Sequence, residues 1–297
     1  MLQKQHHKLL PFTNRSANTQ NIDFSLKLKQ TNGSTTPPKK RKMMSLLVHQ
    51  SVPINRRPRI PEEYKNIDVF VYCCGKSGSS TLHTTMAKNG FSSLHCHGNH
   101  YFQTIIHKKT DITVFDVINH NRRNKNVVYF IDSYRTPIER AISAFFQNID
   151  TRAPNYKTMS IQQLIARFNV DLFGRSVQNS IYEVMDHYRV PHFSSFDFEK
   201  KYNIAQQGNM VFIKVRFSDI KEWSDILSRV FDQSITISSS NLTDQKDVST
   251  LYGEFKRIYR VPRRYLLHHL TKDRQFAIYN TAEEQAAYLD YWTKKSV

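Results

Sequence analysis

The chain has 297 residues, 39% of them hydrophobic, which is enough for one sizeable α/β domain or two small ones with a buried core. Its formal net charge of +18, from 43 Lys and Arg against 25 Asp and Glu, indicates polyanionic partners such as nucleotides, nucleic acid or acidic polysaccharide. No apolar run approaches the ~18 to 20 residues that a transmembrane helix needs, which excludes an ordinary membrane-spanning protein.

The first 62 residues carry little apolar periodicity. They are rich in Asn, Gln, Ser, Thr, Lys and Pro, a composition that buries too little surface to offset the entropy of folding. We therefore predict a disordered basic tail over residues 1–62 and a single α/β domain over residues 63–297. Within the tail, PPKKRK at residues 37–42 resembles a nuclear localisation signal, although short basic clusters are also frequent in flexible tails.

Two features predict an intracellular protein. The N-terminus, MLQKQHHKLLPF, turns polar at once and lacks the apolar region of a secretory signal peptide. Cys73, Cys74 and Cys96 are too few and too close together for a disulfide framework. We expect a reducing compartment, the cytoplasm, with the nucleus as the alternative, and find no support for the Golgi lumen.

A buried strand and a turn rich in glycine and hydroxyl groups open the domain. Residues 67–74, IDVFVYCC, lack alternation and are typical of a strand covered on both faces. Such turns aim backbone N–H groups at an anion, and the helix that follows adds its dipole. An ATP or GTP loop of the Walker A type is disfavoured because Phe70 occupies the position of its first glycine. The alternative is an ordinary strand-to-helix turn.

Helices and strands alternate along the next part of the chain. The patterns predict a helix over 80–90 that ends at Asn89-Gly90, a strand over 91–97, a helix over 110–124 and a strand over 126–133. This rhythm predicts parallel strands joined by right-handed crossovers. Ligands bind such sheets at the carboxyl ends of the strands, where the turn and the segment over 132–146 both lie.

The segment over 132–146, DSYRTPIERAISAFF, predicts a second anion site. Arg135 leaves the strand, Pro137 suits the first helical turn, and Ser143 lies about two turns into the helix, so Arg135 and Ser143 can bracket one phosphate. In the alternative interpretation, Arg140 and Glu139 are solvent-facing charges and Ser143 is a small packing residue.

The remaining elements are predicted mainly from their apolar spacing. We expect a helix over 161–168, a loop-rich stretch over 187–204, a buried strand over 209–220 and helices over 248–259 and 281–295. Thr281 and Glu284 have the spacing of a capping box at the start of the last helix.

Taken together, the two predicted anion sites resemble those of sulfotransferases that use 3′-phosphoadenosine 5′-phosphosulfate. In that family a KSGT-type loop holds the 5′-phosphosulfate, and an Arg and Ser pair within RDPxxRxxS holds the 3′-phosphate. The matching loop residues here are Lys76, Ser77, Gly78, Ser79, Ser80 and Thr81, and the matching pair is Arg135 and Ser143. The resemblance implies a P-loop NTPase-like fold in three layers, with a mainly parallel sheet flanked by helices.

The likeness extends over roughly residues 66–293. VFIKVRFSDI is similar to the family's RxEDL strand, with Arg216 and Asp219 retained and Ser218 in place of the glutamate. The segments ERAISAFFQNI, FDFEKKYNI and IYNTAEEQAAYLDYW are similar to those of the sulfotransferase-like capsular polysaccharide synthesis proteins. Two departures stand out: Thr136 replaces the usual aspartate, and the NKWYS-like segment is present only as DVSTLY. Either departure suits an altered acceptor or weakened activity.

The resemblance implies in-line transfer of a sulfuryl group to a hydroxyl of a carbohydrate or similar acceptor. Lys76 is then the group that stabilises the leaving phosphate oxygen, and no metal is expected. A base of near-neutral pKa favours histidine, so His97 is the first candidate and His95 the second. Satisfied polar histidines in a loop, or a zinc site lacking an evident further ligand, are the alternatives.

Other basic residues do not identify the acceptor. Arg152, Arg175, Lys200, Lys201 and Arg216 would suit an acidic acceptor chain, but a solvated charged surface explains each of them equally well. The competing functions are a non-catalytic nucleotide- or nucleic-acid-binding protein on the same fold, and an atypical kinase in which Asp132 holds Mg²⁺.

Overall fold

The computed structural model describes residues 58–104, 106, 110–174, 180–238 and 248–296. The chain divides into two units, Met1–Ile54 and Asn55–Val297, and every described residue belongs to the second. Almost all of the predicted tail, with the basic cluster at 37–42, lies outside the described residues. Ile60 is buried against the core beside Ile67, so the core takes in residues that precede the predicted domain boundary.

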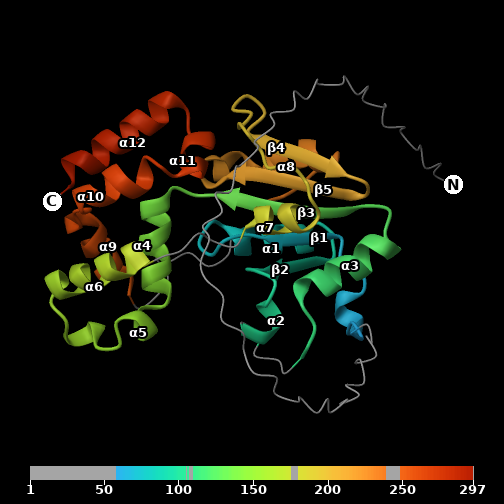
Figure 1. Cartoon of the computed structure of the whole chain (residues 1–297), viewed down its shortest axis with the longest axis horizontal. Helices are drawn as coiled ribbons and strands as arrows, with labels where there is room; N and C mark the ends of the chain where they lie inside the picture. Colours follow the sequence, from blue (N-terminus) through green and yellow to red (C-terminus); the bar gives the residue numbers. More distant parts are fainter. Residues whose placement is uncertain (1–57, 105, 107–109, 175–179, 239–247, 297) are drawn as a thin grey trace, which may run out of the picture. The chain divides into compact units, whose positions relative to one another are not determined.

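A five-stranded sheet lies at the centre of this unit, with the strand order β2-β1-β3-β5-β4 (Figure 1). Neighbouring strands are parallel except β4, which pairs antiparallel with β5. The prediction of a mainly parallel α/β sheet flanked by helices is therefore confirmed. The strands are β1 (Val69–Tyr72), β2 (Ser93–Cys96), β3 (Val128–Tyr134), β4 (Tyr202–Gln207) and β5 (Met210–Arg216).

Strand β4 corrects one prediction, because its residues fall partly in the stretch that we expected to be loop-rich. The strand reads YNIAQQ, and most of its side chains are at least partly exposed because it lies at the edge of the sheet. Gly208, at a φ of 58°, makes the turn into β5. A polar edge strand lacks the apolar run by which the buried strands were predicted.

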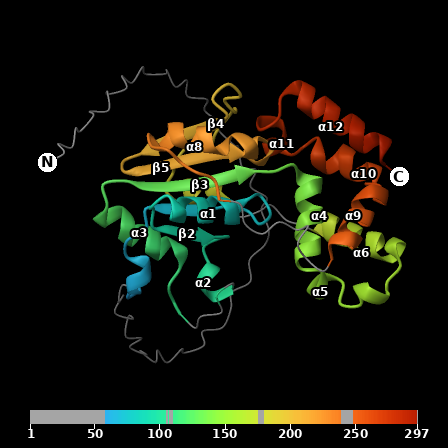
Figure 2. The same cartoon turned by 180° about the vertical axis from the view of Figure 1, so that it is seen from behind.

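Helices cover both faces of the sheet. On one face, α1 (Ser79–Lys88) and α8 (Trp223–Phe231) pack Leu82, Met86 and Trp223 against the strands. On the other face lie α2 (Tyr101–Thr104), α3 (Val114–Asn124) and α7 (Ile181–His187), and the two views agree on this layering (Figures 1 and 2). The sheet and its two helical layers make the three-layer arrangement that we predicted.

A second group of helices packs around its own apolar cluster beyond the carboxyl end of β3 (Figure 2). Aromatic rings dominate this cluster, and Phe145, Phe168 and Phe255 contact one another there. Its elements are α4 (Pro137–Gln147), α5 (Ile149–Arg152), α6 (Ile161–Gly174), α9 (Ser249–Ile258), α10 (Arg263–Tyr265), the π-helix η5 (Leu266–Leu270), α11 (Arg274–Ile278) and α12 (Ala282–Lys294).

Several helix ends agree with the local sequence. Helix α1 is followed by Asn89 as C-cap and by Gly90 at a φ of 88°, as the sequence predicts. The capping box of Thr281 and Glu284 is confirmed at α12. The short 3₁₀ helices are η1 (Glu62–Tyr64), η2 (Tyr156–Thr158) and η3 (Phe217–Glu222). Within the described ranges, no helix is both long and apolar enough to cross a bilayer.

Candidate functional site

The strand order locates the point where a ligand is expected. From β1 the chain first crosses to β2 on one side and then to β3 on the other, so the connections diverge between β1 and β3. In open α/β sheets this divergence leaves a crevice at the carboxyl ends of the two strands. The loop after β1 and Arg135 after β3 both lie at this place, as the sequence predicts.

The loop from Cys73 to Gly78 has a backbone held in an uncommon conformation. Lys76 has a φ of 68° and Gly78 a φ of 89°, both in the left-handed region. The Ser77 hydroxyl donates to the Cys74 carbonyl over 2.8 Å and closes the turn. A Cβ atom on Gly78 would lie 2.7 Å from the Trp223 ring, so glycine is required by both space and conformation.

Gly78 is also the N-cap of α1, and it supplies no side-chain hydrogen bond to the first turn. The first N–H groups of a helix have no partner within the helix, and here no capping side chain takes that place. Ser79 and Thr81 are almost fully buried in this turn, and Ser80 is half-buried. The start of α1 therefore offers backbone donors together with the positive end of the helix dipole.

The two predicted anion sites meet at Arg135. Its Nη1 donates to the Lys76 carbonyl over 3.0 Å, so the guanidinium after β3 holds the loop after β1. The same guanidinium lies over the Phe217 ring, 4.5 Å from its centroid. Burial lowers the pKa of Arg135, although this side chain stays charged at neutral pH.

A pocket of about 110 Å³ opens beside Arg135. Four of its residues have basic, acidic or amide side chains, and they come from two distant parts of the chain. The lining consists of Cys74, Tyr134, Arg135, Pro137, Arg140, Ser180, Asp273 and Gln275. Sequence reasoning missed Ser180, Asp273 and Gln275, and it considered Arg140 only in the alternative interpretation, as a solvent-facing charge.

Ser143 does not line this pocket. It is buried on α4 among apolar side chains, with 3% of its surface exposed. The structure therefore does not bring Ser143 together with Arg135 there, and Arg140, on the first turns of the same helix, lies beside Arg135 instead.

Three histidines gather at the base of the loop. The ring of His95 stacks on His83, and the edge of His97 meets His95 at a centroid distance of 4.5 Å. His97 Nδ1 lies 2.7 Å from the Cys73 carbonyl, which only accepts, so Nδ1 carries the proton and Nε2 the basic lone pair. Cys96, between the two histidines, belongs to the apolar cluster on the other face of the sheet, as strand alternation predicts.

His95 is poorly suited to accept a proton. Burial, followed by the neighbouring histidines, lowers the pKa of His95 to about 3. Its Nε2 is buried and has no hydrogen-bond partner among the described residues. No group of three or more His, Cys, Asp or Glu side chains in the described part of the chain has the arrangement of a metal site.

Asp132 is not placed to hold a magnesium ion. Its side chain is fully buried and forms an ion pair with the equally buried Lys214. The carboxylate also accepts from the backbone N–H groups of Ser133 and Ile181, over 2.7 Å and 3.3 Å. These partners make Asp132 an internal part of the sheet.

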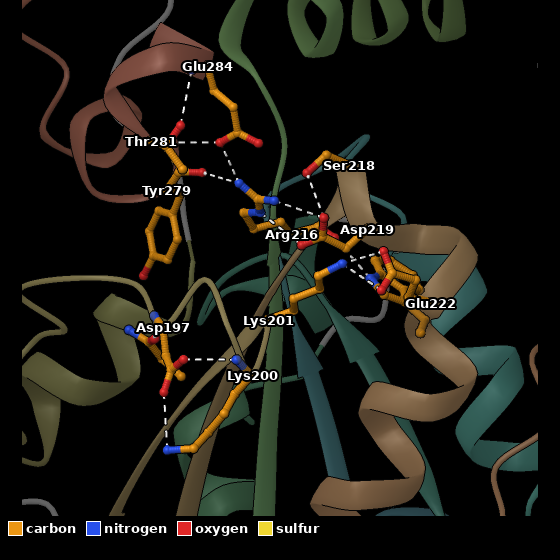
Figure 3. Close-up of polar contacts among 12 residues, drawn as sticks. Asp197, Lys200, Lys201, Arg216, Ser218, Asp219, Glu222, Tyr279, Thr281 and Glu284 are labelled. Carbon is orange, nitrogen blue, oxygen red and sulfur yellow. Dashed lines mark hydrogen bonds and ion pairs between the residues drawn. The ribbon is translucent and has the colours of Figure 1, made fainter.

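The retained Arg216 and Asp219 form a buried network rather than an open site (Figure 3). Arg216 donates to both carboxylate oxygens of Asp219, over 2.8 Å and 2.9 Å, and to Glu284 over 2.6 Å. Its Nη1 also donates to the Tyr279 carbonyl over 3.3 Å. Arg216 thus fastens η3 to the start of α12, and it is not free to attract an acceptor.

The other cations considered for an acidic acceptor are also paired where the structure describes them. Lys200 pairs with Asp197 and Lys201 with Glu222 (Figure 3), and Arg152 pairs with Asp171. Arg175 lies outside the described residues.

Comparison of the chain with protein-family models, curated proteins and solved structures finds no match. The likeness to the sulfotransferases therefore rests on sequence motifs alone.

Proposed function

We propose that this protein transfers a sulfuryl group from 3′-phosphoadenosine 5′-phosphosulfate to a hydroxyl of a carbohydrate or similar acceptor. The observation that carries the proposal is the hydrogen bond from Arg135 to the Lys76 carbonyl. It brings two anion-binding segments together at the divergence of the sheet, an arrangement that suits a nucleotide with phosphates at both its 5′ and 3′ ends. With it we propose the sulfotransferase version of the P-loop fold.

In the proposed reaction the acceptor oxygen attacks sulfur in line with the bridging phosphate oxygen. A new oxygen–sulfur bond forms as the old one breaks, the acceptor proton passes to a base, and adenosine 3′,5′-bisphosphate leaves. Negative charge develops on the bridging oxygen, where Lys76 and the N–H groups at the start of α1 would stabilise it. No metal is required for this charge balance.

His97 is the better candidate for the base. The hydrogen bond to the Cys73 carbonyl fixes the tautomer with its lone pair on Nε2, as general-base catalysis requires. His95, with a pKa of about 3, would hold an abstracted proton too weakly. We therefore assign the role to His97 and a positioning role to His95, whose ring packs against it.

A non-catalytic role in binding nucleic acid is the second candidate, because one segment of the surface is strongly basic. Residues 256–274 carry seven Lys and Arg against one acidic residue, Asp273. All seven are exposed, and none forms an ion pair with another described residue; they are Lys256, Arg257, Arg260, Arg263, Arg264, Lys272 and Arg274.

Calorimetric titration of the full chain with adenosine 3′,5′-bisphosphate, AMP and ATP tests the proposal. We expect selective binding of the bisphosphate, weakened more than tenfold, or about 1.4 kcal/mol, in Arg135→Ala and in Lys76→Ala. Thermal melting of each variant serves as the control, because Arg135 also holds the loop. Equal binding of the three nucleotides by the wild type would refute the donor site.

Turnover needs a separate measurement. Release of adenosine 3′,5′-bisphosphate from the phosphosulfate is followed with a panel of neutral and acidic polysaccharides. We expect acceptor-dependent release that is lost in His97→Asn and retained in His95→Asn at a reduced rate. Selective nucleotide binding with no release from any acceptor would favour the non-catalytic candidate.

A further inference from the structure

The pocket beside Arg135 contains two arginines without a carboxylate partner. Neither Arg135 nor Arg140 forms an ion pair with a described residue. The carboxylate nearest in sequence, Glu139, instead accepts from Tyr288 over 2.6 Å and from Trp292 over 3.2 Å. The protein thus places two arginines in one partly enclosed space, while the adjacent carboxylate takes its hydrogen bonds from side chains of α12.

Arg140 lies close enough to Arg135 for its charge to act on that guanidinium. Burial lowers the pKa of Arg135, the charges of Tyr252 and Glu139 oppose that effect, and the positive charge of Arg140 adds to it. Both side chains are partly buried, and repulsion between like charges in such a place costs free energy unless an anion lies between them. Guanidinium forks match the oxygens of a phosphate or sulfate group, so the pair is suited to a dianionic group.

The lining of the same pocket also provides an acceptor. Asp273 is the N-cap of α11, and its Oδ1 accepts from the N–H groups of Gln275 and Phe276, over 2.8 Å and 3.2 Å. Its Oδ2 makes no hydrogen bond with a residue that the structure describes, and the side chain is only partly exposed. A carboxylate oxygen in this place suits a hydroxyl donor on a ligand, and it disfavours a second anionic group.

These groups define a ligand with a phosphate and a hydroxyl close to each other. We propose that the pocket binds the phosphorylated ribose end of the nucleotide, with Arg135 and Arg140 on the 3′-phosphate and Asp273 accepting from the neighbouring 2′-hydroxyl. The assignment rests on the proposed function and deepens it. Arg140 takes the role that the motif assigned to Ser143, and Asp273 adds selectivity for ribose over deoxyribose.

The phosphate part is tested with Arg140→Gln in the full chain, titrated with adenosine 3′,5′-bisphosphate and with AMP. We expect at least tenfold weaker binding of the bisphosphate and an unchanged affinity for AMP, which lacks the 3′-phosphate. Arg123→Gln, which removes an exposed arginine of α3, is the matched control and should change neither affinity. Ser143→Ala should also leave both unchanged.

Two failures are distinguishable in this experiment. If the wild type prefers the bisphosphate over AMP and Arg140→Gln binds it equally well, the donor site stands and the role of Arg140 is refuted. If the wild type shows no preference for the bisphosphate, the proposed function fails and this assignment fails with it.

The proposed contact between Asp273 and the 2′-hydroxyl is tested by changing the ligand, which leaves the protein unaltered. The wild type should bind 2′-deoxyadenosine 3′,5′-bisphosphate several-fold more weakly than the ribose form. Asp273→Asn keeps an oxygen for the cap of α11 but removes the second carboxylate oxygen, so it should bind the two ligands with equal affinity. Equal binding by the wild type, or discrimination that persists in Asp273→Asn, would overturn the role of Asp273.

Discussion

The absence of a side chain at Gly78 allows the loop its backbone conformation and allows the Trp223 and Phe217 rings to pack closely against it. In Gly78→Ala the new Cβ would meet the Trp223 ring at 2.7 Å and the Phe217 ring at 2.9 Å, in a backbone conformation that alanine rarely adopts. We expect a loss of about 1–3 kcal/mol in the free energy of unfolding, together with loss of nucleotide binding. Urea unfolding and calorimetry measure the two effects.

Gly253 provides the matched control for this prediction. It lies within α9 and is exposed, and a Cβ added there would have no neighbouring atom within 4 Å. Gly253→Ala should stabilise the protein by roughly 0.5–1 kcal/mol, because alanine favours a helix interior. Similar losses of stability in the two variants would contradict the role given to Gly78.

His95 makes stability depend on pH. Its folded-state pKa of about 3 lies below the ordinary value of 6.5, so its contribution is complete above pH 6.5 and is lost as the pH falls toward 3. The unfolded chain takes up the proton first, and each pH unit within this window costs up to about 1.4 kcal/mol. Between pH 6.5 and pH 5 we therefore expect a loss of up to about 2 kcal/mol from this residue.

Urea unfolding at both pH values measures this loss, with His95→Phe as the test variant. Phenylalanine removes the titrating ring and the unpartnered Nε2, so the variant should lose less stability on acidification than the wild type. His268→Gln, which removes an exposed histidine, should behave like the wild type. Parallel losses in the wild type and His95→Phe would show that His95 does not carry the effect.

At the scale of elements, Arg216 joins three parts of the chain. It lies at the end of β5 and contacts Asp219 of η3 and Glu284 of α12 (Figure 3). Arg216→Ala would leave the nearly buried Asp219 without its partner, and we expect a loss of about 3–5 kcal/mol. Thermal and urea unfolding provide the measurement.

The neighbouring pair of Lys201 and Glu222 gives the comparison. Its contact of 2.6 Å is as short as that of Arg216 with Glu284, but Glu222 is 51% exposed, so solvent screens the interaction. Lys201→Ala should cost less than about 1 kcal/mol. If the two substitutions cost the same, burial is not what makes the Arg216 network strong.

The elements differ in how well the sequence predicts them, for physical reasons. Strands β1, β3 and β5 are covered on both faces, so burial imposes the unbroken apolar runs that make them recognisable. Strand β4 lies at an edge and carries polar side chains, which hides it among loop residues. The capping box at α12 was readable because its two residues interact locally.

The residues of the candidate site also differ in how well the sequence predicts their positions. Lys76 and Arg135 could be placed at adjoining strand ends because the order of elements implies parallel strands. Asp273 and Gln275 could not, since their place beside β3 depends on how the C-terminal helices pack. Arg140 carried a weaker signal: it lies one helical turn after Thr136, near the N-terminus of α4.

For the molecule as a whole, the net charge of +18 predicts polyanion binding with a strong dependence on salt. We expect Arg263→Gln, Arg264→Gln and Lys272→Gln together to lower the slope of log affinity against log salt by about 2 for single-stranded RNA. Fluorescence anisotropy at several salt concentrations gives the slope. A control with three exposed cations removed elsewhere combines Lys88→Gln, Arg123→Gln and Lys221→Gln.

Comparison of the two triple variants distinguishes the effect of where the cations lie from the effect of the total net charge. A larger change in the first variant assigns polyanion binding to residues 256–274. Equal changes in both variants would mean that only the total charge matters, and the second candidate function would lose its structural basis.

The pocket also has a consequence for the order of events during synthesis. The ribosome produces the chain from its N-terminus, so all five strands, the last ending at Arg216, are complete before Asp273 and Gln275 emerge. A nascent chain can therefore assemble its sheet while the pocket still lacks a wall. A ligand that contacts this wall cannot assist the folding of the sheet. It can only stabilise the packing of the C-terminal helices, which are synthesised last.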